Sequence, residues 1–226
     1  MVLLSASEIQ AQTTAYQFKT TDGNFWKMSS LTLSDKVPGK AQVVIRSSQP
    51  QQTFLGWGTC FNELPWDAYN LLSDNDKQLL VKRMFNPYGD LRLQKGRLSA
   101  GANDYAREWY SCDEIDVNET DFEMEHFNID RDLTTIIPSI KLALAENPEI
   151  DFFCSPWSPP TWMKTNKHYA QRKTNTNGCP FNVPPYFNDQ FIDDPRYYKA
   201  YCLYFDKFIN AYKEQGINIT SLAYQN

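Results

Sequence analysis

The chain has 226 residues, of which 42% are hydrophobic and 22% are charged, and these shares are those of an ordinary globular protein rather than a disordered or repetitive one. Its 27 acidic residues outnumber 22 basic ones, so the basic surplus of a nucleic-acid binder is missing and no nucleic-acid partner is expected. No apolar run reaches the roughly 18 residues of a membrane-spanning helix, and with two histidines, His126 and His168, no histidine-rich metal centre is expected.

The amino-terminal residues 1–12 resemble the end of a secretory signal, because a short apolar stretch is followed by a small residue, Ala11, at which cleavage could fall. No basic residue precedes Lys19, so a plain disordered terminus is the alternative interpretation. Residues 13–50 are polar and contain short alternating stretches, such as 41–46, next to proline. These stretches predict two or three β-strands that stand apart from the alternating strands and helices of the rest of the chain.

From residue 53 onward, strand-like and helix-like segments alternate along the chain. The first strand is predicted at 53–61 and its helix at 73–85, where Ser73 followed by Asp76 three residues later is typical of a capping box. A second strand is expected at 91–98, and a long loop follows it.

The second half of the sequence continues this alternation. A helix is predicted at 130–145, because apolar residues recur on one of its faces, and a short buried strand follows at 150–154. After a long polar loop, a third helix begins with Asp194 as its cap and ends before Gly216, with its aromatic residues on one face. A fourth strand is expected at 219–224.

Strands that alternate with helices of this length favour an α/β fold with a parallel sheet. A doubly wound dinucleotide-binding sheet is disfavoured, since Gly56-Trp57-Gly58 lacks the third glycine of that fingerprint. The other fold with alternating strands and helices is a (β/α)8 barrel, in which the active site lies at the carboxyl ends of the strands. Four strands cannot close such a barrel, so the chain is either half of one or a different fold.

The predicted strand ends combine polar and aromatic side chains. They are the stretch 60–63 after the first strand, Arg97 and Asp104 after the second, 155–162 after the third and Gln225-Asn226 after the fourth. Aromatic residues make up 15% of the chain, and flat rings with polar rims suit either a thick core or a carbohydrate-binding cleft. The strand ends therefore favour a sugar-binding site.

At these strand ends the sequence resembles glycoside hydrolase family 30, the glucosylceramidase-like (β/α)8 enzymes. The matching stretches run in the family's order over about residues 50–226, and they are 56–66, 96–110, the specific Ser-Pro-Trp segment 155–166, and 225–226. The resemblance implies that 51–226 is the first half of a (β/α)8 barrel, about four βα units, truncated after strand four. It also implies that 13–50 supplies strands of a side β-domain.

The chemistry implied by the resemblance is retaining hydrolysis of β-glycosides by two glutamates, without a cofactor. The acid/base is expected immediately after Asn226 and the nucleophile further on, so no catalytic residue is expected within this chain, which alone should be inactive. We expect glucosylceramidase-type hydrolysis of β-glucosidic bonds by an exported full-length protein. The alternatives are an endo-β-1,6-glucanase of the same family, a non-catalytic sugar-binding fragment, and a half barrel that associates through its open edges.

Four substrate-binding residues follow from the resemblance: Arg97, Asp104, Trp157 and Asn226. Arg97 would keep neighbouring carboxylates charged, and Asp104 would accept hydrogen bonds from sugar hydroxyls. Trp157 would stack on a sugar ring, and Asn226 would bind its 2-hydroxyl group. A core-edge salt bridge, a loop cap and plain packing are the alternative roles of the first three. Glu63 lies near a strand end, but the resemblance gives it no catalytic role.

Overall fold

The computed structural model describes residues 14–32, 39, 44, 46, 48–171, 173–179 and 190–224. The expected signal segment 1–12, most of the stretch 41–46, and Asn226 lie outside the described residues. The chain forms two compact units, Met1–Thr53 and Phe54–Asn226. None of the helices in the described part of the chain has the length and apolarity needed to cross a membrane.

The first unit contains an antiparallel hairpin of β1 (Thr14–Thr21) and β2 (Asn24–Thr32). The two strands are joined by Asp22-Gly23, and Gly23 has a φ of 70°. An Asp-Gly pair suits a two-residue hairpin because glycine adopts positive φ without a steric penalty. Two strands are therefore present in the region for which two or three were predicted.

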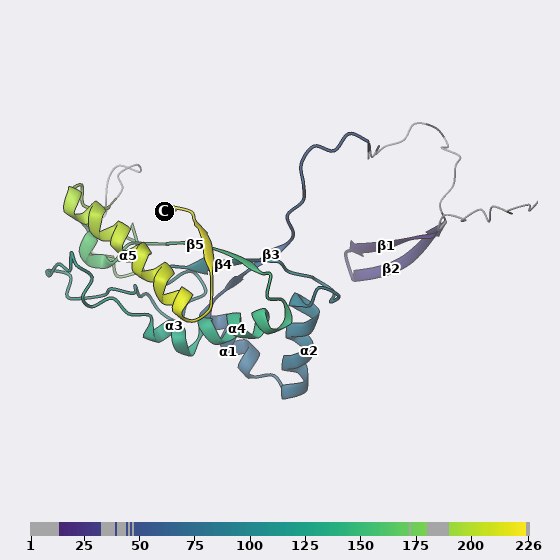
Figure 1. Cartoon of the computed structure of the whole chain (residues 1–226), viewed down its shortest axis with the longest axis horizontal. Helices are drawn as coiled ribbons and strands as arrows, with labels where there is room; N and C mark the ends of the chain where they lie inside the picture. Colours follow the sequence, from purple (N-terminus) through teal and green to yellow (C-terminus); the bar gives the residue numbers. More distant parts are fainter. Residues whose placement is uncertain are drawn as a thin grey trace, which may run out of the picture. The chain divides into compact units, whose positions relative to one another are not determined.

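The second unit is built on one parallel sheet with helices in the connections (Figure 1). Its strands are β3 (Gly58–Phe61), β4 (Lys95–Ser99), β5 (Asp151–Ser155) and β6 (Ile219–Leu222). They lie in the order β3-β4-β5-β6, which is also their order in the chain. These four strands contain no reversal of strand order of the kind that a doubly wound sheet has at its switch point.

Helices fill each connection between successive strands. α4 contacts α1, α2 and β3, and Figure 1 shows α1, α2 and α4 gathered beside the sheet. The elements are α1 (Glu63–Asn70), α2 (Asp74–Phe85), α3 (Asp130–Thr134), α4 (Ile136–Glu146), the 3₁₀ turn η1 (Thr161–Met163) and α5 (Pro195–Glu214).

The prediction of a single helix at 130–145 is wrong, because the structure divides this segment into α3 and α4. The division falls at Thr135, whose φ of −127° and ψ of −73° are not helical. Pro138 explains it: proline has no N–H to donate, and its ring would clash with the carbonyl group of Thr134 in a continuous helix. The short helix α1, which begins directly after β3, was not predicted.

The core lies between the sheet and its helices. Phe61 of β3 stacks on Phe85 of α2 with ring centroids 5.8 Å apart and also contacts Phe152 of β5. A Cβ atom at Gly96 would lie 2.5 Å from the Phe152 ring, so β4 needs glycine there. Most of the largest fully buried side chains of the core come from β4, β5, η1, α4 and α5, and they include Trp162, Leu98, Phe152, Ile136, Ile137, Ile140, Tyr204, Phe208 and Tyr212.

Candidate functional site

Arg97 lies on the face of the sheet that the core does not cover. It stands between Cys60 of β3 and Phe153 of β5 in the strand register. Successive residues of a strand point to opposite faces, so Arg97 is partly exposed while Leu98 is fully buried. The Nε atom of Arg97 donates a hydrogen bond to Oγ of Ser155 at 2.9 Å.

Trp157 joins Arg97 to Asp104. The guanidinium carbon of Arg97 lies 4.2 Å from the centroid of the Trp157 ring, which is a cation–π contact. The indole Nε1 of Trp157 donates a hydrogen bond to Oδ1 of Asp104 at 3.2 Å. The structure thus brings together three of the four predicted site residues, whereas the fourth, Asn226, lies outside the described residues.

The loop that carries Asp104 is fixed at both ends. The backbone N–H of Ala102 donates to the carbonyl oxygen of Tyr110 at 3.0 Å, which closes the loop at its base. The side-chain amide of Asn103 donates to that of Asn62 at 2.8 Å, so the residue before Asp104 is tied to the end of β3. The exposed Asp104 carboxylate therefore occupies a defined position, as a site for hydroxyl groups requires.

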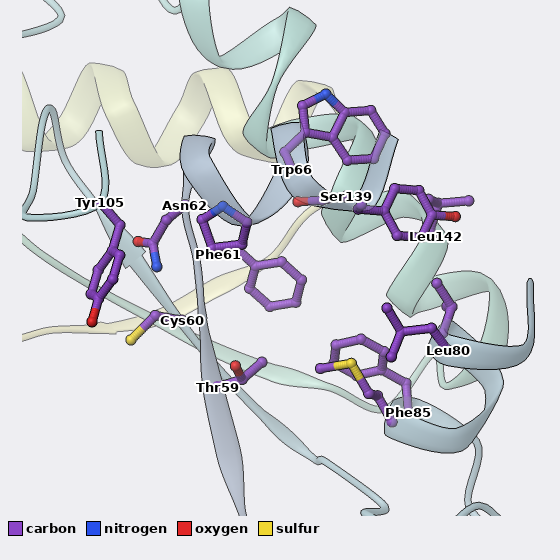
Figure 2. A pocket seen from close by; sticks show the side chains of 14 residues that line it. Thr59, Cys60, Phe61, Asn62, Trp66, Leu80, Phe85, Tyr105, Ser139 and Leu142 are labelled. Carbon is purple, nitrogen blue, oxygen red and sulfur yellow. The ribbon is translucent and has the colours of Figure 1, made fainter. Parts of the chain in front are cut away.

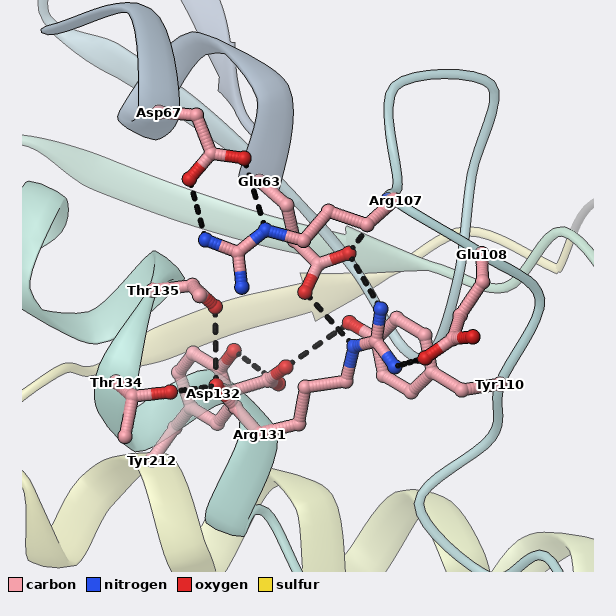
Figure 3. A network of polar contacts seen from close by, with 10 residues as sticks. All are labelled: Glu63, Asp67, Arg107, Glu108, Tyr110, Arg131, Asp132, Thr134, Thr135 and Tyr212. Carbon is pink, nitrogen blue, oxygen red and sulfur yellow. Dashed lines mark hydrogen bonds and ion pairs between the residues drawn. The ribbon is translucent and has the colours of Figure 1, made fainter. Parts of the chain in front are cut away.

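Glu63 is enclosed by arginine side chains and belongs to the network in Figure 3. It is 1% exposed, and its carboxylate accepts hydrogen bonds from Nε and Nη2 of Arg131 at 2.7 and 3.0 Å and from the backbone N–H of Arg107 at 2.8 Å. Burial alone would raise the pKa of Glu63, but these hydrogen bonds and charges outweigh it and place the pKa below its usual value. A carboxylate held in this way anchors the loop and cannot reach a substrate.

Asp132 is the second buried carboxyl group of the network. It is fully buried and accepts hydrogen bonds from the hydroxyl groups of Tyr110 at 2.9 Å and Tyr212 at 2.7 Å. Burial raises the pKa of Asp132 to about 6, although both tyrosine hydrogen bonds oppose the rise. Because Asp132 belongs to α3 and Tyr212 to α5, this contact ties α3 to α5, and the hydrogen bond from Tyr110 adds the loop after β4 (Figure 3).

Sequence reasoning missed three residues around this cluster. Ser155, which accepts the Arg97 hydrogen bond, lies two residues after Phe153 and so on the same face, and strand parity could have indicated it. Tyr169 donates its hydroxyl hydrogen to the carbonyl oxygen of Ala102 at 2.7 Å, and Trp109 stacks on its ring with centroids 5.4 Å apart. No sequence signal places Tyr169 there, because it lies in the irregular loop after η1.

The apolar pocket in Figure 2 is separate from the cluster around Trp157. It has a volume of about 320 Å³ and lies among β3, α1, α2 and α4. Its lining includes Phe61, Trp66, Leu80, Met84, Phe85 and Leu142, and it contains none of the predicted site residues. Within the part of the chain that the structure describes, no three His, Cys, Asp or Glu side chains lie where they could hold a metal ion.

Comparison with known proteins matches residues 54–226 to the glycosyl hydrolase family 30 TIM-barrel domain. "Putative glucosylceramidase 1" of Caenorhabditis elegans is 31% identical over 189 residues, which cover 83% of this chain and 33% of that protein. Endo-1,6-beta-D-glucanase neg1 of Aspergillus fumigatus is 27% identical over 180 residues, which cover 80% of this chain and 36% of that protein. The solved structure of the endo-beta1,6-glucanase BT3312 superposes with a TM-score of 0.62 at 26% identity, and the match covers 80% of this chain and 36% of that one. The chain spans about a third of the length of these relatives.

Proposed function

Because the chain belongs to glycosyl hydrolase family 30, we propose that it is the amino-terminal part of a retaining β-glycosidase that hydrolyses β-glucosidic bonds. The observation that carries the proposal is the contact chain from Arg97 through Trp157 to Asp104. Arg97 belongs to β4, Asp104 to the connection after β4 and Trp157 to the connection after β5. They meet at the carboxyl ends of these strands, where (β/α)8 enzymes build their active sites.

The fold supports the same proposal. We assign β3 to β6 with their helices to the first four units of a (β/α)8 barrel, since a sheet with this strand order can continue until it closes. We assign the β1–β2 hairpin to a side β-domain, and the full protein to an exported location at the cell surface, in the periplasm or outside the cell.

The proposed reaction uses two glutamates beyond Asn226, one as acid/base and one as nucleophile, about 5–5.5 Å apart as retaining enzymes require. The residues of this chain would bind the sugar. Asp104 would accept hydrogen bonds from its hydroxyl groups, and Trp157 would stack on its apolar face. Arg97 would keep the neighbouring carboxylates ionised, and Asn226 would bind the 2-hydroxyl group more strongly in the transition state.

Glucosylceramide is the substrate we favour, since the C. elegans relative reaches 31% identity. An endo-β-1,6-glucanase is the second candidate, and the similarity to BT3312 and to neg1 supports it. For the 226 residues alone, sugar binding without hydrolysis is the activity we expect, because the proposed catalytic glutamates lie outside them.

The test is hydrolysis by the full-length protein of glucosylceramide and of β-1,6-glucan, with the configuration of the first-formed sugar followed by proton NMR. We expect cleavage of one of them with retention at the anomeric carbon. Inversion contradicts the retaining mechanism, and failure to cleave either substrate contradicts the proposed function.

Variants of the cluster test the assigned residues in the same assay. Trp157→Ala and Asp104→Asn should each lower kcat/KM by about tenfold or more, the effect of losing a hydrogen bond to a charged group or a buried aromatic contact. Asp116→Asn is the matched control, because this exposed aspartate lies in the same connection but outside the cluster. Unchanged kinetics of both cluster variants would contradict the assignment.

A further inference from the structure

Two carboxyl groups that the proposed mechanism does not use lie in the connection between β4 and α3. Asp113 is fully buried and Asp121 is 7% exposed. The Oδ2 atom of Asp113 accepts a hydrogen bond from the indole Nε1 of Trp162 at 2.9 Å. The other oxygen, Oδ1, is buried and has no hydrogen-bond partner among the described residues, an arrangement that is unfavourable for an ionised carboxylate.

The carboxyl group of Asp121 lies within hydrogen-bonding reach of Asp113. On its other side, Oδ2 of Asp121 is 2.8 Å from the backbone nitrogen and 2.9 Å from the ring Nδ1 of His126. Two ionised carboxylates side by side would repel each other, and neither could donate a hydrogen bond. One proton on Asp113 removes the repulsion and gives its oxygen a partner.

Few other charges face this pair. η1 contributes only the neutral indole of Trp162. From α5, the Arg196 guanidinium lies over the ring of Phe122, 5.3 Å from its centroid, and Lys207 donates to the carbonyl oxygen of Met124. Within the segment, the exposed Glu125 side chain acts on His126. The groups that act directly on Asp113 are therefore Trp162, Asp121 and His126.

The electrostatics assign the proton to Asp113 and the charge to Asp121. Burial raises the pKa of Asp113 to about 6. Burial also acts to raise the pKa of Asp121, but hydrogen bonds from His126 and from the backbone of Glu125 outweigh it and lower that pKa. The hydrogen bond that the His126 ring donates to Asp121 raises the pKa of His126 in turn.

We propose that Asp113 and Asp121 share one proton and that this proton, by joining two parts of the segment 111–129, holds the segment in its folded arrangement, which makes the order of this segment dependent on pH. The pKa of Asp113 is higher in the folded state than in the unfolded chain, so its protonation stabilises the folded state. This stabilisation is complete below the ordinary aspartate pKa near 4 and is lost as pH rises through about 6.

Asp113→Asn tests the proposal, because an asparagine can accept the indole hydrogen bond with its oxygen and donate to Asp121 with its amide at any pH. The measurement is hydrogen exchange by mass spectrometry, reported as protection factors for peptides of 111–129 at pH 5 and pH 7.5. In the unsubstituted protein, protection should fall by about ten- to a hundredfold, a factor of ten for each unit of pKa difference. The Asp113→Asn variant should retain its protection at pH 7.5.

Glu123→Gln is the control, since it neutralises an exposed carboxylate of the same segment and should follow the unsubstituted protein. Equal pH dependence in the Asp113→Asn variant and the unsubstituted protein overturns the proposal. A second measurement needs no variant: the carboxyl ¹³C signal of Asp113 should titrate well above that of Asp121. Titration of both groups below pH 4 would show two ionised carboxylates and would also overturn it.

Discussion

Asp132 shows how a buried acid is kept in place by neutral donors. Its only hydrogen-bond donors among the described side chains are two tyrosine hydroxyl groups, whereas Glu63, close by in the same network, is matched by the charge of Arg131. The two acids therefore respond in opposite ways: the pKa of Asp132 is raised to about 6, and that of Glu63 is lowered. Burial acts to raise both pKa values, and only at Glu63 do the hydrogen bonds and charges of its partners outweigh it.

Tyr212→Phe should destabilise the protein more at pH 7 than at pH 4. The folded state favours protonated Asp132, so its contribution is full below about pH 4 and is lost as pH rises through 6. Removal of the Tyr212 hydroxyl raises this pKa further and leaves the ionised form with one donor fewer, at a cost of about 1–3 kcal/mol at neutral pH.

Urea unfolding of the Tyr212→Phe variant at both pH values measures this cost. Tyr198→Phe, at a position of α5 that is 50% exposed, serves as the control. A cost that is the same at pH 4 and pH 7 would show that Asp132 does not titrate in this range.

Single residues of the site could be named from the sequence, but their contacts could not. Arg97, Asp104 and Trp157 stand in motifs that resemble those of a known family. The hydrogen bond between Asp104 and Trp157 joins positions 53 residues apart, and it depends on the register of β4 with β5 and on the loop that closes at Ala102. Such contacts are set by packing of the whole sheet, which no local pattern encodes.

At the scale of elements, the sequence predicts those whose ends carry capping residues. α2 begins after Ser73 and α5 after Asp194, as the capping pattern indicates, and in both helices the side chain of the capping residue accepts a backbone hydrogen bond. α1 and the break between α3 and α4 were missed. Asn62 and Thr135 precede α1 and α4 without a side-chain cap, and a proline lies in the first turn of each of these two helices.

Ser73→Ala should destabilise α2 by about 0.5–2 kcal/mol, because the backbone N–H of Asp76 loses the acceptor that caps the first turn. Ser73→Thr should preserve most of the stability, since threonine offers the same oxygen. Thermal unfolding of the three proteins measures the difference. Equal melting temperatures for the alanine and threonine variants would mean that the cap contributes nothing.

At the scale of the whole molecule, the alternation of strands and helices predicts a parallel sheet, and the structure confirms it. The alternation does not fix how long each strand is. β4 begins at Lys95 rather than at residue 91, because Leu91 and Leu93 instead donate backbone hydrogen bonds to the end of α2. β4 is therefore shorter than the predicted strand at 91–98.

The protein should be most stable near pH 4. The pKa values of Asp113 and Asp132 are both raised to about 6, so stability falls as pH rises from about 4 through 6. Glu63 and Asp121 have lowered pKa values, and their contributions are lost as the pH falls below about 4. Urea midpoints at pH 3.5, 5 and 7.5 at constant ionic strength measure the curve. A midpoint at pH 7.5 equal to or above that at pH 5 would contradict it.

The strand order β3-β4-β5-β6 also bears on how the chain folds as it leaves the ribosome. Each of β4, β5 and β6 pairs with the strand that was synthesised just before it, so every new strand meets an edge that has already emerged. The long connections between them delay this pairing only modestly, because the entropy of closing a loop grows slowly with its length. A sheet of this order can therefore grow at one edge, strand by strand, in the direction of translation.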